Sequence, residues 1–170
     1  MGDTVRRIVT QLDPGGKSVF LSDGPPATIA KFSGGFLLAE LWTLDAPPTD
    51  PSVGSEPTTF ALEPPPGGIT YRLATIPPDT EVFAQLGTLR AELGENPVIS
   101  LDPDEYGMHQ TQTVDFVTIL SGEVALRLDD AEVHLKAGDC VVQRGTRHAW
   151  RNHSAEPCVL SCVLVSTRRP

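Results

Sequence analysis

Turn-forming residues divide this chain into short apolar segments, and this rhythm is the feature that most constrains the fold. Glycine, proline and aspartate recur between the segments, so that segments follow one another at intervals of roughly eight to twelve residues. Short strands at regular spacing indicate a sandwich or barrel, because βαβ units would need helical patterns between the strands. The sequence therefore predicts an all-β chain that closes as a jelly-roll barrel. The clearest strand candidates are residues 5–12, 18–21, 36–44, 69–76, 124–128 and 158–165.

One stretch, residues 80–93, has helical rather than strand periodicity. Its apolar residues Val82, Leu86, Leu89 and Leu93 recur every three or four positions, and a glycine follows the last of them. We therefore predict one short helix inserted in the barrel. Two roles stay open for it: a lid or flank of a cavity, or a surface helix that buries an apolar stripe and takes no part in chemistry.

The composition of the whole chain is typical of a soluble protein. The 170 residues are 39% hydrophobic, which is enough to bury a core, and no apolar run approaches the roughly 18 residues that a spanning helix needs. A net charge of −9 disfavours nucleic acid as a partner, since surfaces that bind the phosphate backbone are basic. The N-terminus has no signal-peptide pattern. We expect a cytoplasmic protein with no membrane or nucleic-acid partner.

A polar strand face lies near the middle of the chain, between residues 107 and 115. Side chains alternate between the two faces of an extended strand, so His109, Thr111, Thr113 and Asp115 point one way. Imidazole and carboxylate are common ligands of zinc, iron, manganese and nickel. The face therefore has the residue types of a metal site, although threonine is a poor ligand for any of these ions.

A second polar face follows the turn at residues 144–146. His148, Trp150 and Asn152 alternate on one face of the next predicted strand, while Arg151 and His153 fall on the other face and are expected at the surface. His148 is the best candidate for the remaining metal ligand. Trp150 would either form a flat wall of the same cavity or pack in the core, and Asn152 would line the cavity with it.

These two faces resemble the paired motifs of the cupin superfamily of small β-barrels, over roughly residues 105–165. Thr111 stands where the first cupin motif usually has a second histidine, and Asp115 stands where it usually has glutamate. The second motif has a turn that is one residue shorter than usual and lacks the usual proline. The positions that carry the resemblance are Gly107, His109, Thr111, Asp115 and Gly122 in the first motif, and Gly138, Gly145, His148 and Asn152 in the second.

The resemblance implies a small-molecule site inside the barrel. His109, Asp115 and His148 would hold a divalent metal, for which iron, zinc, manganese and nickel all remain open. Tyr106 would hang over the mouth of the barrel as a hydrogen-bond donor, and Thr111 and Thr113 would contact the ligand. Without a metal, the two histidines and the carboxylate could still act as general acid and base.

The function that follows is that of a cupin-type enzyme, for which four reaction classes stay open. The resemblance implies a metal-dependent dioxygenase, decarboxylase, isomerase or cyclase, thus an oxidoreductase or a lyase, acting on a small oxygenated or aromatic compound. The alternative is a cupin that binds a small ligand without turnover and has lost its metal site.

The predicted division of the chain is an N-terminal β extension, residues 1–66, and a cupin barrel, residues 67–170, within one structural domain. Cupins commonly pair through strands outside the barrel, and the apolar strands of the extension have no obvious partner in the two motifs. We therefore expect a homodimer, in which the extension packs on the barrel or crosses to the neighbouring subunit.

Overall fold

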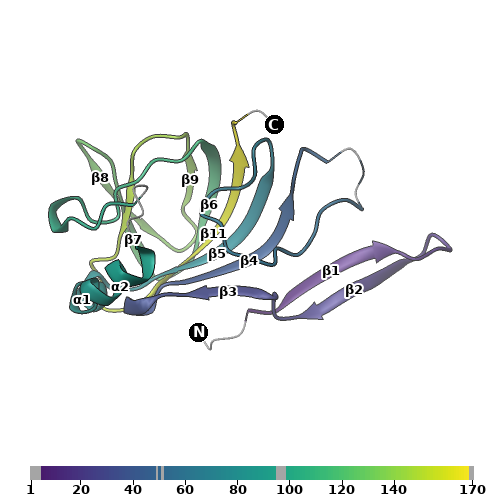
Figure 1. Ribbon diagram of the computed structural model, residues 1–170, viewed down its shortest axis with the longest axis horizontal. Coiled ribbons are helices and arrows are strands. Elements are labelled where there is room, and N and C mark those ends of the chain that lie inside the picture. The colour runs from purple at the N-terminus through teal and green to yellow at the C-terminus, as the bar shows by residue number, and fades with distance from the viewer. Residues whose placement is uncertain (1–4, 49, 51, 95–98, 169–170) are drawn as a thin grey trace.

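Eleven strands in three antiparallel sheets form the chain, which the computed structural model describes over residues 5–48, 50, 52–94 and 99–168 (Figure 1). This confirms the predicted all-β jelly-roll fold. The strands are β1 (Arg7–Leu12), β2 (Ser18–Gly24), β3 (Thr28–Lys31), β4 (Leu37–Leu44), β5 (Ile69–Ile76), β6 (Thr113–Ser121), β7 (Glu123–Arg127), β8 (Glu132–Lys136), β9 (Cys140–Gln143), β10 (Ala149–Arg151) and β11 (Cys158–Ser166).

The largest sheet has six strands in the order β3-β4-β5-β11-β6-β9, and its inner face is one wall of the barrel. In β5, Arg72, Ala74 and Ile76 are buried on this face, and β11 buries Leu160 and Cys162 beside them. The smaller sheet has the order β10-β7-β8. The core lies where β5, β6, β7 and β11 bring their buried apolar side chains together. Its members are Ala74, Ile76, Val117, Ile119, Val124, Cys158, Leu160, Cys162 and Leu164.

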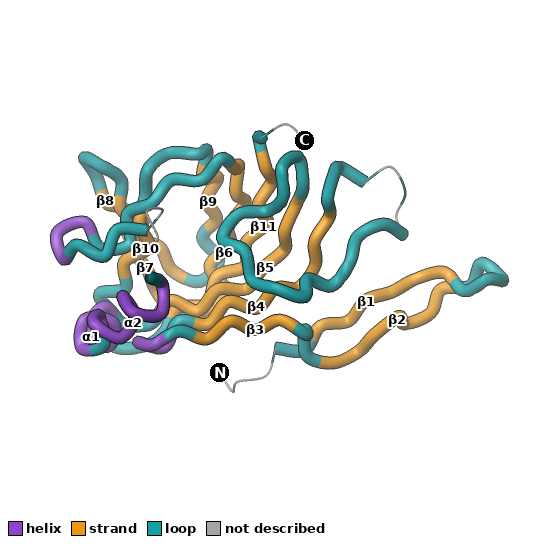
Figure 2. The backbone as a smooth tube through the Cα atoms, viewed as in Figure 1, coloured by secondary structure: helices purple, strands orange, loops and turns teal. Residues whose placement is uncertain are grey.

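Two short helices replace the single helix that the sequence predicted. They are α1 (Asp79–Ala84) and α2 (Leu86–Leu93), separated by Gln85, whose backbone leaves the helical region with φ −119° and ψ 13°. Val82 and Leu89 are buried as the apolar spacing predicted, and that spacing continues unchanged through a break of one residue. The periodicity therefore located the apolar stripe but not the break. Figure 2 shows both helices, in purple, at one end of the sheets.

None of the helices in the described parts of the chain is long and apolar enough to cross a membrane.

Strands β1 and β2 form a hairpin that projects from the rest of the molecule (Figure 1). Arg7 joins it to the body, through a hydrogen bond to the carbonyl oxygen of Leu41 and an ion pair with Glu56. Strand β4, by contrast, pairs with β5 inside the six-stranded sheet, and β3 pairs with β4. The main sheet thus continues across residue 66, and within the described part of the N-terminal extension only the hairpin has a sheet of its own.

Candidate functional site

Reciprocal backbone hydrogen bonds place His109 beside His148. The amide of His109 donates to the carbonyl oxygen of His148 at 2.9 Å, and the amide of His148 donates back to His109 at the same distance. The two imidazole rings consequently lie with their centroids 4.3 Å apart. His109 lies ahead of β6, which begins at Thr113, so this isolated bridge rather than a long strand positions the ring.

Each imidazole is held by a backbone carbonyl two residues before it in the chain. Nδ1 of His109 lies 2.7 Å from the carbonyl oxygen of Gly107, and Nδ1 of His148 lies 2.9 Å from that of Thr146. A carbonyl oxygen can only accept, so Nδ1 carries the proton in both rings. In the neutral form each Nε2 is then left with a free lone pair, ready to take a proton or bind a cation.

Burial keeps both imidazoles neutral near physiological pH. Loss of solvation lowers the pKa of His109 below its ordinary value, and the hydrogen bond to Gly107 opposes this only in part. Loss of solvation, reinforced by the neighbouring His109, lowers the pKa of His148 to about 4. The charge on a protonated His109 thus opposes a second proton on His148. The pair accepts its first proton more readily than its second.

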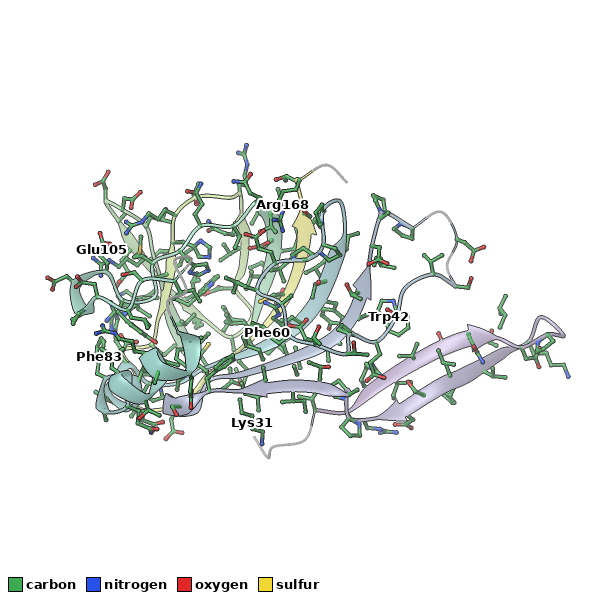
Figure 3. All side chains as sticks on the ribbon, in the orientation of Figure 1. Lys31, Trp42, Phe60, Phe83, Glu105 and Arg168 are labelled. Atoms are coloured by element: carbon green, nitrogen blue, oxygen red, sulfur yellow. The ribbon has the colours of Figure 1, made fainter. Side chains whose placement is uncertain are left out.

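The two rings form part of the wall of a cavity of about 200 Å³. Helix α2 contributes Leu89 and Leu93, so the predicted helical stretch flanks the cavity. Phe60, labelled in Figure 3, comes from the loop before β5 and lies inside the body of the molecule. The other apolar lining includes Phe32, Phe36, Leu38, Leu62, Ala74, Ile76, Ile99, Leu101, Tyr106, Val117, Trp150, Leu160 and Leu164, and the polar lining includes Arg72, His109, Thr111, Asp115, His148 and Cys162.

The predicted polar strand face is buried, but it reaches the cavity only in part. Thr111, Thr113 and Asp115 are all buried, as the alternation required. Thr111 and Asp115 line the cavity, whereas Thr113 is not among the lining residues. The hydroxyl groups of Thr111 and Thr113 are hydrogen-bonded at 2.8 Å, so Thr113 supports the wall from behind.

Trp150 and Tyr106 line the cavity as walls rather than at its mouth. Trp150 packs against the apolar core and also contacts His148, with the ring centroids 6.0 Å apart. Tyr106 is only 3% exposed and packs with Val82 and Leu89 in a second core cluster, so it does not overhang the opening. Burial raises the pKa of Tyr106, which keeps its hydroxyl group protonated.

Asn152 lies away from the cavity and links the end of β5 to the loop before β11. Its side-chain nitrogen donates to the carbonyl oxygens of Ile76 and Glu156, and it is fully buried. The backbone N–H of Asn152 donates to Asp79 Oδ1. Asp79 Oδ2 forms an ion pair with Arg151 Nη2 at 2.8 Å. The surface position predicted for Arg151 was therefore wrong, because its charge is buried against Asp79.

The metal site predicted from the sequence is only partly assembled. His109 and His148 lie side by side, but no three or more His, Cys, Asp or Glu side chains come together to hold an ion within residues 5–48, 50, 52–94 and 99–168. Catalytic zinc sites, for comparison, use three protein ligands. The described residues therefore supply two of the three predicted ligands, and Asp115 does not join them. A bound divalent metal stays a prediction.

Sequence reasoning missed an ion pair behind the cavity wall, between Arg72 of β5 and Glu40 of β4. Arg72 Nη2 lies 2.6 Å from Glu40 Oε1, and both side chains are almost completely buried. The Arg72 guanidinium also donates to the carbonyl oxygens of Ala61 and Leu62. It also stacks over the ring of Phe60, with Cζ of Arg72 5.1 Å from the ring centroid. The one signal in the sequence was an arginine on the same strand face as Ala74 and Ile76.

Several known proteins are similar in sequence to this chain. The family described as "Cupin domain" matches residues 97–165. Phomopsin biosynthesis cluster proteins C' and D of Diaporthe leptostromiformis are each 34% identical over 162 residues, which cover 89% of this chain and 72% of theirs. Oryzines biosynthesis cluster protein J of Aspergillus oryzae is 51% identical over 63 residues, covering 36% of this chain and 35% of its own.

Solved structures also resemble this chain. A Cupin 2 conserved barrel domain protein from Salinispora arenicola covers 83% of this chain and 83% of its own, with 15% identity and a TM-score of 0.46.

Proposed function

The chain belongs to the cupin superfamily, and from that premise we propose that it is a small-molecule enzyme whose paired imidazoles transfer protons to and from an apolar substrate. The observation that carries this proposal is the contact of His109 with His148, two neutral rings with free Nε2 lone pairs on the wall of an apolar cavity. The names of the relatives, which refer to biosynthesis clusters, support small-molecule metabolism.

His109 is the residue that takes the substrate proton. The charge on a protonated His109 opposes protonation of His148, so the pair of neutral rings takes up one further proton and His148 stays neutral beside it. When His109 Nε2 takes a proton from a carbon next to a carbonyl group, the C–H electron pair moves into an enolate. The imidazolium then returns the proton to another atom of the substrate. Isomerase, cyclase and lyase reactions all use steps of this kind.

The exchange of deuterium into an aryl ketone tests the proposal without knowledge of the natural substrate. Propiophenone in deuterium oxide should lose its hydrogens next to the carbonyl group faster with the protein than without it, as followed by proton NMR. Because general bases contribute about 10²–10⁴-fold to rate, His109→Gln is expected to lower the catalysed exchange by that factor, and His148→Gln, which removes the neighbouring ring, is expected to lower it by less. His134→Gln is the matched control, since it removes an exposed imidazole outside the cavity.

Two outcomes of the exchange experiment count against the proposal. Equal exchange by the wild type and both cavity variants would show that the pair is not the base. Binding of the ketone with no catalysed exchange would favour the alternative function, a ligand-binding cupin without turnover.

A divalent metal held by the same two imidazoles is the second candidate, favoured by their free Nε2 lone pairs. Elemental analysis of protein purified without chelator tests it. Iron, zinc, manganese or nickel near one atom per chain, lost in both His109→Gln and His148→Gln, would replace the metal-free pair by a metal centre. Exchange that persists after removal of metals by a chelator would support the pair acting alone.

We also propose that a second copy of the chain covers the outer face of the six-stranded sheet. One row across this face consists of Tyr71, Val163, Phe116 and Val142 on β5, β11, β6 and β9. Tyr71 is 41% exposed, Phe116 52% and Val142 58%. Large exposed apolar patches on soluble proteins mark interaction sites. The projecting hairpin also exposes apolar side chains, which are Ile8, Leu12, Val19, Phe20 and Leu21.

Light scattering at micromolar concentration tests this assembly. The wild type should have twice the chain mass of 18.2 kDa. Phe116→Lys, on the sheet face, and Phe20→Lys, on the hairpin, should both give the monomer mass, because each puts a charge in the apolar contact. Leu128→Lys, an exposed apolar residue elsewhere, should leave the dimer intact. A monomeric wild type would contradict the proposal.

A further inference from the structure

Two charged residues line the cavity away from the histidine pair. Arg72 of β5 and Asp115 of β6 flank β11, and Cys162 of β11 lies opposite Arg72 in the sheet register. Arg72 is 5% exposed and Asp115 is 7% exposed, so both are removed from bulk water. Charged groups in such a position need partners, because burying a charge without a partner costs on the order of several kcal/mol.

Arg72 uses only part of its donor capacity within the protein. Its terminal nitrogens form an ion pair with Glu40 and donate to the carbonyl oxygens of Ala61 and Leu62. Nε, however, is buried and has no hydrogen-bond partner in the described part of the chain. A guanidinium can donate five hydrogen bonds, so not all of its donors are used, and the Nε–H of this lining residue is one that is left over.

Asp115 has the complementary atom left over. Its Oδ1 is buried and, among the residues described, accepts no hydrogen bond. Burial raises the pKa of Asp115, while a hydrogen bond with Thr113 and the charge of Arg72 oppose the rise and the charge of Glu63 adds to it. Oδ1 of the carboxyl group is therefore an acceptor without a donor among the residues described.

We infer that Arg72 and Asp115 recognise a hydroxyl group on an otherwise apolar, preferably aromatic, substrate; this rests on the proposed function of the cavity. A hydroxyl group donates one hydrogen bond and accepts others, so it can serve Asp115 Oδ1 and Arg72 Nε together. A carboxylate cannot donate to Asp115. It would also meet the carboxyl group of Asp115 beside an arginine that is already paired with Glu40.

The size of the cavity fits a single ring with a short side chain. A dry apolar cavity of about 150 Å³ accepts benzene. The cavity here is somewhat larger, at about 200 Å³, and aromatic side chains such as Phe60 and Trp150 line it. An aromatic body would therefore lie against these rings while its hydroxyl group reaches Arg72 and Asp115.

Three ligands that differ only in one group test the inference: para-propylphenol, propylbenzene and para-propylbenzoate. Titration by NMR, with no turnover involved, should show the phenol binding about tenfold or more tightly than propylbenzene, as expected for hydrogen bonds to charged groups. The benzoate should bind more weakly than the phenol. Asp115→Leu should remove the preference for the phenol and leave the affinity for propylbenzene within about twofold.

Two further variants separate recognition from damage to the fold. Asp115→Asn has nearly the shape of the native residue and keeps an acceptor, so it should retain the preference for the phenol and bind the benzoate better than the wild type does. Asp130→Leu is the matched control, because it makes the same change as Asp115→Leu at an exposed turn. It should bind all three ligands as the wild type does.

Equal affinity of the wild type for the phenol and propylbenzene would overturn the inference, as would a phenol preference that survives in Asp115→Leu. Binding of none of the three ligands would overturn it as well. These results are independent of the deuterium exchange: a phenol preference without catalysed exchange would refute the proposed reaction while supporting the ligand class.

Discussion

Replacing Arg72 by methionine is expected to lower the free energy of unfolding by about 3–5 kcal/mol. The substitution leaves the carboxylate of Glu40, whose side chain is only 2% exposed, without its cationic partner. Burial already raises the pKa of Glu40, although the charge of Arg72 and a hydrogen bond with it act to lower that pKa. Loss of the arginine therefore removes the interactions that favour the charged carboxylate. Urea denaturation followed by circular dichroism measures the change.

The controls for this prediction separate a buried pair from an exposed one. The double variant Glu40→Leu/Arg72→Met removes both charges, so it should recover most of the stability that the single variant loses. Arg6→Met breaks the pair of Arg6 with Asp23, whose side chains are 68% and 45% exposed, and should cost far less stability than Arg72→Met does. A loss as small in Arg72→Met as in Arg6→Met would contradict the prediction.

Acidification from about pH 6.5 to about pH 4 is expected to destabilise the wild type, relative to His148→Gln, by about 3 kcal/mol. Burial and the neighbouring His109 lower the pKa of His148 to about 4 in the folded protein, while the unfolded histidine titrates near its ordinary value of about 6.5. Between these values the unfolded chain binds a proton that the folded chain does not, so the free energy of unfolding falls as the pH falls. Glutamine does not titrate, so His148→Gln lacks this contribution to the pH dependence of the free energy of unfolding.

The measurement is a series of urea denaturations between pH 4 and pH 7 on the wild type and the variant. The raised pKa values of Glu40 and Asp115 act in the opposite direction, but both proteins contain these groups, so the difference between the two curves isolates His148. His134→Gln, which removes an exposed imidazole, should follow the wild type. Parallel curves for the wild type and His148→Gln would show that the ring is not buried in its neutral form.

The alternation of side chains along a strand predicted much of the candidate site. It placed Thr111 and Asp115 inside, and Gln110 and Gln112 are exposed on the other face. The same rule failed at Asn152, because β10 ends at Arg151 and the chain turns away from the cavity there.

The ion pairs behind the site could not be predicted from local patterns. Arg151 bonds to Asp79 across 72 positions of sequence, so the pair depends on how β10 meets the start of α1. In β5 the strand bounds were predicted correctly, but both faces carry apolar residues. Tyr71 and Leu73 alternate with Ala74 and Ile76, so the pattern does not decide which face is buried and whether Arg72 turns inward.

The reciprocal backbone bonds between His109 and His148 make the position of the two imidazoles independent of the parts of the chain that shape the rest of the cavity. The imidazoles are fixed by main-chain atoms, whereas Phe60 and Leu62 come from a loop and Leu89 and Leu93 come from α2. Substitutions in the loop and the helix can therefore change the size of the accepted molecule while the two rings keep their spacing. A chain built in this way can come to hold a molecule of another size while the two imidazoles stay where they are.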